Sequence, residues 1–276
     1  MSRQQALQTF DEALHISYSQ IFTYLGCSLK YRLAYVEQRR PKRISIALPF
    51  GRAMHTAIER FYRSLMKDRK EPLAVLEELF EDSLSTRLGQ TKVPIIYKKE
   101  TPDTQASIDM GKALLKVFYD NNEVAPADIV DVEIPLTATL YTQEGEPTDF
   151  KLVGIVDLLM KGKDSDAVPV DHKTWAQRKA QSAIDKDLQF SSYAYLLAAN
   201  KYVPLTAPVT CHINALRKLK KPKLEHFKTT RTAKDRRRFA KIASAVLAGI
   251  ENQIFIPNYS WMCSDCGYTE ACEAWS

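Results

Sequence analysis

The chain has 276 residues, and 45% of them are hydrophobic, so it is long enough to bury a sizeable core. Its formal net charge of +6 at pH 7 is a mild basic excess, which is compatible with a polyanionic partner without requiring one. The sequence has no uninterrupted apolar run near the roughly 18 residues of a membrane helix, and its polar N-terminus lacks a signal-peptide core. We therefore expect a cytoplasmic protein with no membrane partner.

The first half of the sequence is expected to be mainly helical. Ser17 and Gln20 form a capping-box pattern, which predicts the start of a helix. Apolar residues then recur at helical spacing over residues 49–66, and further helices are expected over 73–88 and 107–121.

The second half changes to a period of two, which is typical of strands. The expected elements are strands over 130–138, 150–160 and 167–174, a helix over 186–201, strands over 209–216 and 224–230, and a helix that begins after Thr232 and ends near Gln253. Turns are expected around Gly145 and over 162–166. This order predicts an α/β protein with a helical region built from the N-terminal half.

We interpret the whole chain, residues 1–276, as one domain with three parts. Residues 1–125 form a mainly helical part, residues 126–256 an α/β core, and residues 257–276 a short cysteine-rich tail.

Two carboxylates and a lysine fall on neighbouring expected strands. Asp171 and Lys173 are two residues apart, so their side chains point to the same face, and a tight turn can bring Asp157 beside Asp171. Such carboxylates supply the hard oxygen ligands that Mg²⁺ or Mn²⁺ prefers, and the ammonium can stabilise charge that develops on a phosphate. The set suits metal-assisted phosphodiester hydrolysis, although Asp-x-Lys by itself more often marks an ordinary charged strand edge.

Three further polar residues accompany this set. His55 flanks the apolar stripe of its helix, where a histidine is usually a surface or core residue but can bind a metal at the edge of a cleft. Gln189 and Tyr193 are four residues apart on the following helix and therefore share a face.

Taken in order, these motifs resemble the RecB-like branch of the PD-(D/E)XK nucleases. That pattern is a Gly-x-x-x-His helix, then Gly-x-x-Asp, then Asp/Glu-x-Lys, then Gln-x-x-x-Tyr. It occurs here as Gly51 to His55, Gly154 to Asp157, Asp171 to Lys173 and Gln189 to Tyr193. The resemblance implies a restriction-endonuclease-like core, in which a central mixed sheet is flanked by helices.

The resemblance also implies roles for individual residues. His55, Asp157 and Asp171 would bind Mg²⁺ or Mn²⁺, with help from the Val170 carbonyl. Lys173 would be catalytic together with the two aspartates. The remaining pair, Gln189 and Tyr193, would position DNA or the metal-bound water. Glu133, a further carboxylate on the preceding expected strand, has no assigned role.

The chain has five cysteines, an odd number that argues against a disulfide framework. Cys263, Cys266 and Cys272 form a Cys-x₂-Cys-x₅-Cys cluster, which needs a fourth ligand from Cys27 or Cys211. Spacing alone favours zinc over an iron–sulfur cluster. Cys211 lies in an expected strand, where a buried thiol is the simpler interpretation.

The family resemblance favours iron instead. A subset of RecB-like nucleases, which includes CRISPR-adaptation nucleases and the nuclease domain of AddB-type helicase–nucleases, holds a [4Fe–4S] cluster with one N-terminal and three C-terminal cysteines. Ser19, Tyr24 and Tyr31 approximate the motif around the N-terminal cysteine, while Ser28 replaces its usual proline. By this resemblance, the ligands are Cys27, Cys263, Cys266 and Cys272, and the cluster is a clasp that joins both ends of the chain.

The expected function is a metal-dependent DNA exonuclease that acts on single-stranded ends. CRISPR spacer acquisition and DNA repair or recombination are both open as its context, with a CRISPR integrase or other recombination proteins as partners. Basic residues gather in four clusters, over 30–32, 39–43, 217–223 and 234–241, which favours a groove that follows a phosphate backbone. The alternative is a non-catalytic DNA-binding or assembly module with a structural iron–sulfur or zinc site.

Overall fold

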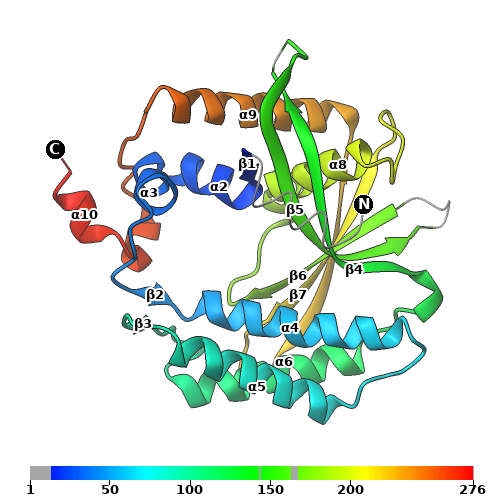
Figure 1. The fold of residues 1–276 in the computed structure, drawn as a ribbon. Coiled ribbons are helices and arrows are strands. Elements are labelled where there is room, and N and C mark those ends of the chain that lie inside the picture. The colour runs from blue at the N-terminus through cyan, green and yellow to red at the C-terminus, as the bar shows by residue number, and fades with distance from the viewer. Residues whose placement is uncertain (1–13, 143, 163–166, 276) are drawn as a thin grey trace.

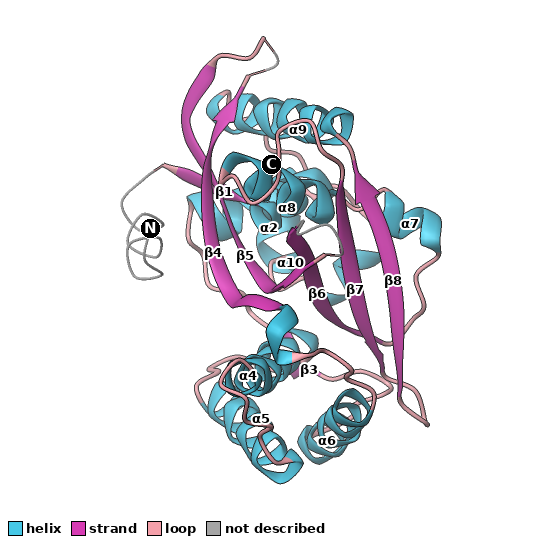
Figure 2. Ribbon diagram, turned by 90° about the vertical axis from the view of Figure 1, so that its right-hand side faces the viewer, coloured by secondary structure: helices cyan, strands magenta, loops and turns pink. Residues whose placement is uncertain are grey.

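A computed structural model describes residues 14–142, 144–162 and 167–275. A six-stranded sheet runs through the molecule, with three long helices gathered at one end of it and three others on the opposite part (Figures 1 and 2). The expected turn over 162–166 lies mostly outside the described residues. The architecture is an α/β fold with a mixed sheet between helices.

The sheet is built around one long strand. Its strands are β1 (His15–Ser17), β4 (Ile129–Tyr141), β5 (Pro147–Lys161), β6 (Ala167–Trp175), β7 (Val209–Arg217) and β8 (Lys223–Arg231). The order is β1-β5-β6-β7-β8, with β4 paired along β5. β1 pairs in parallel with β5, β6 pairs in parallel with β7, and the other pairs are antiparallel. Strands β2 (Ile44–Ser45) and β3 (Ile95–Ile96) form a separate small sheet.

Three helices gather at the lower end of the sheet in both views (Figures 1 and 2). They are α4 (Ala47–Leu65), α5 (Leu73–Gly89) and α6 (Thr104–Asp120). Their buried side chains, such as Phe61, Phe80 and Phe118, form one apolar core with Leu158 of β5 and Leu216 of β7. The amphipathic helix α4 buries its apolar stripe in this core.

A second core lies between the upper part of the sheet and three other helices (Figure 1). These helices are α2 (Tyr18–Gly26), α8 (Leu188–Ala199) and α9 (Ala233–Glu251). Leu158 packs into the first core and Leu159 into the second, because successive side chains of a strand point to opposite faces. Cys211 is fully buried in this second core. The two cores hold β5 from both sides.

The remaining helices are short. They are α3 (Ser28–Tyr31), a π-helical turn (Arg32–Val36), α7 (Gln181–Asp185), α10 (Thr269–Glu273) and two 3₁₀ turns (Pro126–Asp128 and Trp261–Asp265).

The C-terminal tail lies against the N-terminal helices (Figure 1). The Leu29 amide donates to the Ile256 carbonyl at 3.1 Å, and the Lys42 amide donates to the Gly267 carbonyl at 2.8 Å. Arg43 donates through Nε to the Cys266 carbonyl at 3.1 Å. These hydrogen bonds join residues more than 220 positions apart in the sequence, so the two ends of the chain form one region.

The long elements lie where the sequence predicts them, but the short elements were not predicted. Capping boxes at Ser17 and Thr232 are both present, as expected. The sequence did not predict strand β1, helix α7 or the small β2–β3 sheet. Each of these elements has only two to five residues, which is too short for a periodic pattern to be detected. The cysteine-rich tail, for which no element was predicted, contains a 3₁₀ turn and α10.

Candidate active site

The site forms where strand β5 changes partner. On the side opposite β4, β5 pairs with β1 through Val153 and with β6 only from Leu158 onward. Asp157 is the last residue before the β5–β6 pairing begins, and Asp171 is the first residue of β6 beyond it. The two carboxylates therefore sit at a fork, where β5 and β6 cease to pair.

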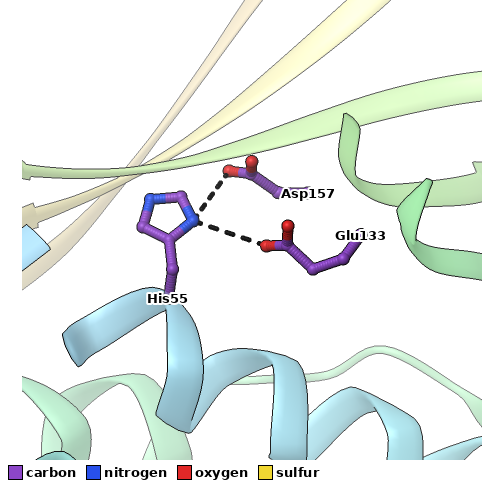
Figure 3. A group of neighbouring side chains, drawn as sticks. All are labelled: His55, Glu133 and Asp157. Atoms are coloured by element: carbon purple, nitrogen blue, oxygen red, sulfur yellow. Dashed lines mark ion pairs between the residues drawn. The ribbon is translucent and has the colours of Figure 1, made fainter. Parts of the chain in front are cut away.

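Three ligand-type side chains converge at this fork (Figure 3). His55 projects from α4, and its Nδ1 lies 3.6 Å from Glu133 Oε1 and 3.6 Å from Asp157 Oδ2. One potential ligand atom from each of the three lies within 4.8 Å of the others, and no other such group exists among the described residues. An imidazole with two carboxylates is a donor set that suits a divalent cation.

Asp171 stands beside this group with its two oxygens in different surroundings. Its Oδ1 accepts hydrogen bonds from Lys173 Nζ at 2.9 Å, Gln189 Nε2 at 2.8 Å and Tyr193 Oη at 3.1 Å. Its Oδ2 is buried and has no hydrogen-bond partner. A buried carboxylate oxygen without a partner is costly, and a bound cation would remove that cost. The orphaned oxygen is a donor that a metal ion could use, and Asp171 itself lies outside the close group of His55, Glu133 and Asp157.

The charges of the site are strongly coupled. Burial lowers the pKa of His55, but Asp157 and Glu133 outweigh it and raise that pKa to about 9. Burial raises the pKa of Asp157, and the neighbouring Asp171 adds to this rise while His55 opposes it. Lys173 keeps its proton, because Asp171 and Asp157 raise its pKa despite its burial. The imidazolium and the ammonium therefore balance a cluster of carboxylates, a role that a divalent cation can share.

His172, between the two motif residues, has a structural role. Its backbone amide donates to Asp157 Oδ2 at 2.8 Å. Its ring is buried, stacks on Tyr62 with centroids 5.5 Å apart, and leaves both ring nitrogens without a hydrogen bond. Burial lowers the pKa of this imidazole to about 3, so it is neutral and does not serve as an acid or base near neutral pH.

The four cysteines of the predicted cluster line one cavity of about 80 Å³, between α2, α3 and the tail. Backbone amides of Lys30 and Ser260 donate to the sulfurs of Cys27 and Cys263, each at 3.4 Å. No three of these four sulfurs, all of them in the described part of the chain, lie within 4.8 Å of one another. Around tetrahedral zinc, the sulfurs would be about 3.8 Å apart. The spacing in the structure is therefore wider than a closed zinc site requires.

The structure brings together most of the residues that the sequence singled out. His55 and Asp157 are in direct proximity, and Asp171 joins Lys173, Gln189 and Tyr193 through hydrogen bonds. Gln189 and Tyr193 were expected to position DNA or water, and here their polar atoms contact a carboxylate. Val170 is buried on β6 beside Asp171.

Glu133 is the residue that sequence reasoning left without a role. It lies on β4 between two residues that pair with Leu158 and Val156 of β5, which places it opposite Asp157. In the sequence, Glu133 is an ordinary polar position of an alternating strand, and only the pairing register reveals which residue it faces.

The fold and the site define a nuclease. A profile of the PD-(D/E)XK nuclease superfamily matches residues 15–273, and the chain belongs to this family. The family implies a metal-dependent nuclease with DNA as its substrate, and the group formed by His55, Glu133 and Asp157 could hold such a metal ion.

Two solved structures are similar to this chain. One, from Eubacterium rectale and named as a candidate exonuclease, has a TM-score of 0.60 at 11% identity and covers 100% of this chain and 93% of its own. The other, SSO0001, has a TM-score of 0.38 at 14% identity, with 89% of this chain and 94% of its own covered. The first shows a shared fold, and the second is too distant to support an argument. No curated protein matches the chain. Among the described residues, no helix is long and apolar enough to cross a membrane.

Proposed function

We propose that the protein is a Mg²⁺- or Mn²⁺-dependent exonuclease that hydrolyses phosphodiester bonds at single-stranded DNA ends. The observation that carries this proposal is the buried Asp171 Oδ2, which lacks any partner beside the group of His55, Glu133 and Asp157. A decayed, non-catalytic relative would have no reason to keep a carboxylate oxygen buried and unpaired. A similar fold in a protein named as a candidate exonuclease is consistent with the proposal.

Each residue of the site has a task in this proposal. His55, Glu133, Asp157 and Asp171 would hold the metal ion, which polarises the scissile phosphate and acidifies a water when bound. Lys173 keeps its proton and donates to an oxygen on which charge develops. Gln189 and Tyr193 donate to Asp171 Oδ1, which leaves Oδ2 without a hydrogen bond and able to accept a cation.

The test of this function is a cleavage assay with end-labelled single-stranded, double-stranded and circular single-stranded DNA. We expect cleavage of the linear single strand with Mg²⁺ or Mn²⁺ and none with a chelator. Asp157→Ala and Lys173→Ala should each lower the rate at least about a hundredfold. Asp149→Ala, an exposed carboxylate on the same strand, is the matched control and should retain full activity. Cleavage of the circular DNA would contradict the proposal that the protein is an exonuclease. Full activity of Lys173→Ala would contradict the assignment of the active site.

We also propose that Cys27, Cys263, Cys266 and Cys272 bind a [4Fe–4S] cluster. One observation supports it: the four cysteines, which come from both ends of the chain, line one cavity. Protein purified without oxygen should contain about four irons per chain. Replacing any one of the four cysteines by Ala should lower the iron content, and Cys211→Ala should not. Stoichiometric zinc without iron would contradict the cluster.

The biological context is a further part of the proposal. The order of the four nuclease motifs and the cysteine spacing resemble CRISPR-adaptation nucleases, which supports a role in trimming DNA before spacer integration, with an integrase as partner. DNA repair or recombination is the other context. Pull-down of an integrase from the source cells by the tagged protein would separate these two contexts.

A further inference from the structure

A second cavity lies away from the nuclease site, between the β4–β5 hairpin and helices α8 and α9. Its volume is about 870 Å³, within the range of small-ligand sites. In Figure 1, the hairpin rises above the rest of the sheet and α9 lies beside it. Lys151 and Asp157 are both on β5, six residues apart, which corresponds to roughly 20 Å along a strand. The cavity is therefore distinct from the metal site but on the same strand.

The charged side chains that line this cavity in the described part of the chain are all positive. Lys151, Arg236, Arg237 and Lys241 line it, and no acidic residue does so among the described residues. The ion pairs of the described part of the chain include none of these four cations. Arg236 and Arg237 also lie near the start of α9, where the helix dipole disfavours cations. An anion bound in the cavity would offset the repulsion among these cations and their unfavourable interaction with the helix dipole.

Two buried polar groups of the cavity lack partners. Arg236 is 6% exposed, and its Nη2 donates to the Leu205 carbonyl while its Nη1 has no hydrogen bond. Thr137 Oγ1 is also buried and without a partner. Both residues line the cavity. Unsatisfied donors of this kind are rare in native proteins, because each costs free energy that a ligand would recover.

The rest of the lining is apolar and aromatic. Alanines of α8 and α9 form one wall, and Tyr195 and Tyr141 contribute rings. The Tyr195 hydroxyl already donates to the Thr139 carbonyl at 2.8 Å, so its ring rather than its hydroxyl is available. Aromatic rings beside cations are what a base and its phosphate require, since the base stacks and the phosphate accepts from guanidinium groups.

We propose that this cavity binds a nucleotide, with its phosphate held by Arg236, Arg237 and Lys241 and its base against the tyrosines. The choice of a nucleotide among phosphate-bearing ligands rests on the proposed nuclease function. The nucleotide has two possible sources: a DNA strand that continues past the metal site along β5, or a free nucleoside monophosphate. Both present the same chemistry to the cavity.

The experiment compares two double variants of α9 in the Asp157→Ala background, which prevents cleavage during binding. Arg237→Gln with Lys241→Gln removes two exposed charges that line the cavity. The matched control, Lys234→Gln with Arg238→Gln, removes two exposed charges from the same helix outside the cavity. The probes are a labelled single-stranded oligodeoxynucleotide, followed by anisotropy, and deoxyadenosine monophosphate, followed by calorimetry.

We expect the cavity variant to weaken binding of at least one probe about tenfold or more, and the control by less than about threefold. A loss for the monophosphate identifies a free-nucleotide site, and a loss for the oligonucleotide alone identifies a strand site. If the cavity variant weakens neither probe more than the control variant does, the proposal is wrong. Because binding is measured in a variant that does not cleave, a negative result in the nuclease assay would not change the outcome of this test.

Discussion

At the scale of single residues, Glu133 is the least expected member of the site. Its φ of +51° lies in the left-handed region, which a non-glycine residue occupies at a cost of about 1 kcal/mol or more. The carboxylate that this backbone directs reaches His55 Nδ1 at 3.6 Å. We infer that the strain persists because it turns a β4 side chain toward the metal ligands of β5.

Glu133→Gln should therefore weaken metal binding more than it alters the fold. The amide keeps the size of the side chain but loses the charge, so the concentration of Mn²⁺ for half-maximal cleavage should rise about 10- to 100-fold. The control is Asp131→Asn, a half-buried carboxylate two residues away whose Oδ1 accepts from the Val132 amide at 2.7 Å. An unchanged metal dependence in Glu133→Gln would remove Glu133 from the site.

The hydrogen bonds around Asp171 make a second prediction at this scale. Tyr193→Phe removes one of the three donors to Asp171 Oδ1 and leaves the buried ring in place. We expect about a tenfold lower cleavage rate at saturating metal, with an unchanged melting temperature, because the carboxylate is less firmly oriented. A double variant with Gln189→Ala should lose more activity than either single variant. Full activity in the double variant would show that the two residues do not position Asp171.

Some cations of the basic clusters make structural contacts, and others have no ion pair in the described part of the chain. Arg217 is buried and pairs with Glu225 at 2.9 Å, and Arg43 binds the Cys266 carbonyl of the tail. These two arginines make contacts within the fold and are not free to follow a phosphate backbone. The cluster over 234–241 differs, because its cations at 236, 237 and 241 line a cavity without any acidic partner among the described residues.

At the scale of elements, two helical glycines have opposite surroundings. A Cβ at Gly51 of α4 would meet nothing within 4 Å. A Cβ at Gly111 of α6 would lie 2.0 Å from Phe80 Cε1, and the Phe80 ring is fully buried between α5 and α6. Gly111 therefore permits the close packing of these helices, whereas nothing in the packing requires Gly51.

Gly51→Ala should stabilise the protein by up to about 1 kcal/mol, because alanine has the higher helix propensity. Gly111→Ala should destabilise it by about 1–3 kcal/mol, because the buried ring of Phe80 must move. Chemical denaturation of both variants gives the two values. If Gly51→Ala is more stable yet cleaves poorly, the glycine of the Gly-x-x-x-His motif serves approach of the substrate to α4. Equal stability changes in the two variants would contradict the packing argument.

At the scale of the whole molecule, the tail and the catalytic fork are separate regions. The cysteine cavity lies between α2, α3 and the tail. None of its lining residues belongs to the group of His55, Glu133 and Asp157 or donates a hydrogen bond to Asp171. The tail closes a loop of nearly the whole chain, which makes a bound cluster an effective constraint on the unfolded state. We therefore expect the cluster to act on cleavage only through folding.

A pair of variants tests this separation. Cys266→Ala should lose iron, melt at a lower temperature, and lose cleavage only in proportion to unfolded protein. Asp157→Ala should keep its iron and melting temperature while cleavage falls at least about a hundredfold. Melting temperature, iron content and initial rate are measured on the same preparations. A Cys266→Ala protein that stays folded to the same temperature but does not cleave would show a direct role of the cluster.

The sequence by itself determined the long elements and the α/β class, and it singled out most of the side chains that meet at the candidate site. Periodicity over ten or more residues is strong enough to locate α4, β5 and α9, and the spacing within each motif places side chains on a common face. This is why spacing alone groups Asp171 with Lys173, and Gln189 with Tyr193. The short elements β1 and α7 could not be predicted, since their conformation depends on neighbours in space.

Only the tertiary structure decided which groups meet across elements. Strand register places Glu133 opposite Asp157, and the change of partner along β5 opens the fork between Asp157 and Asp171. The same is true of the cysteine cavity and of the unpaired Arg236, because burial and missing partners depend on contacts between distant segments. Local sequence specifies the direction of a side chain along its own helix or strand, whereas register and packing specify what that side chain faces.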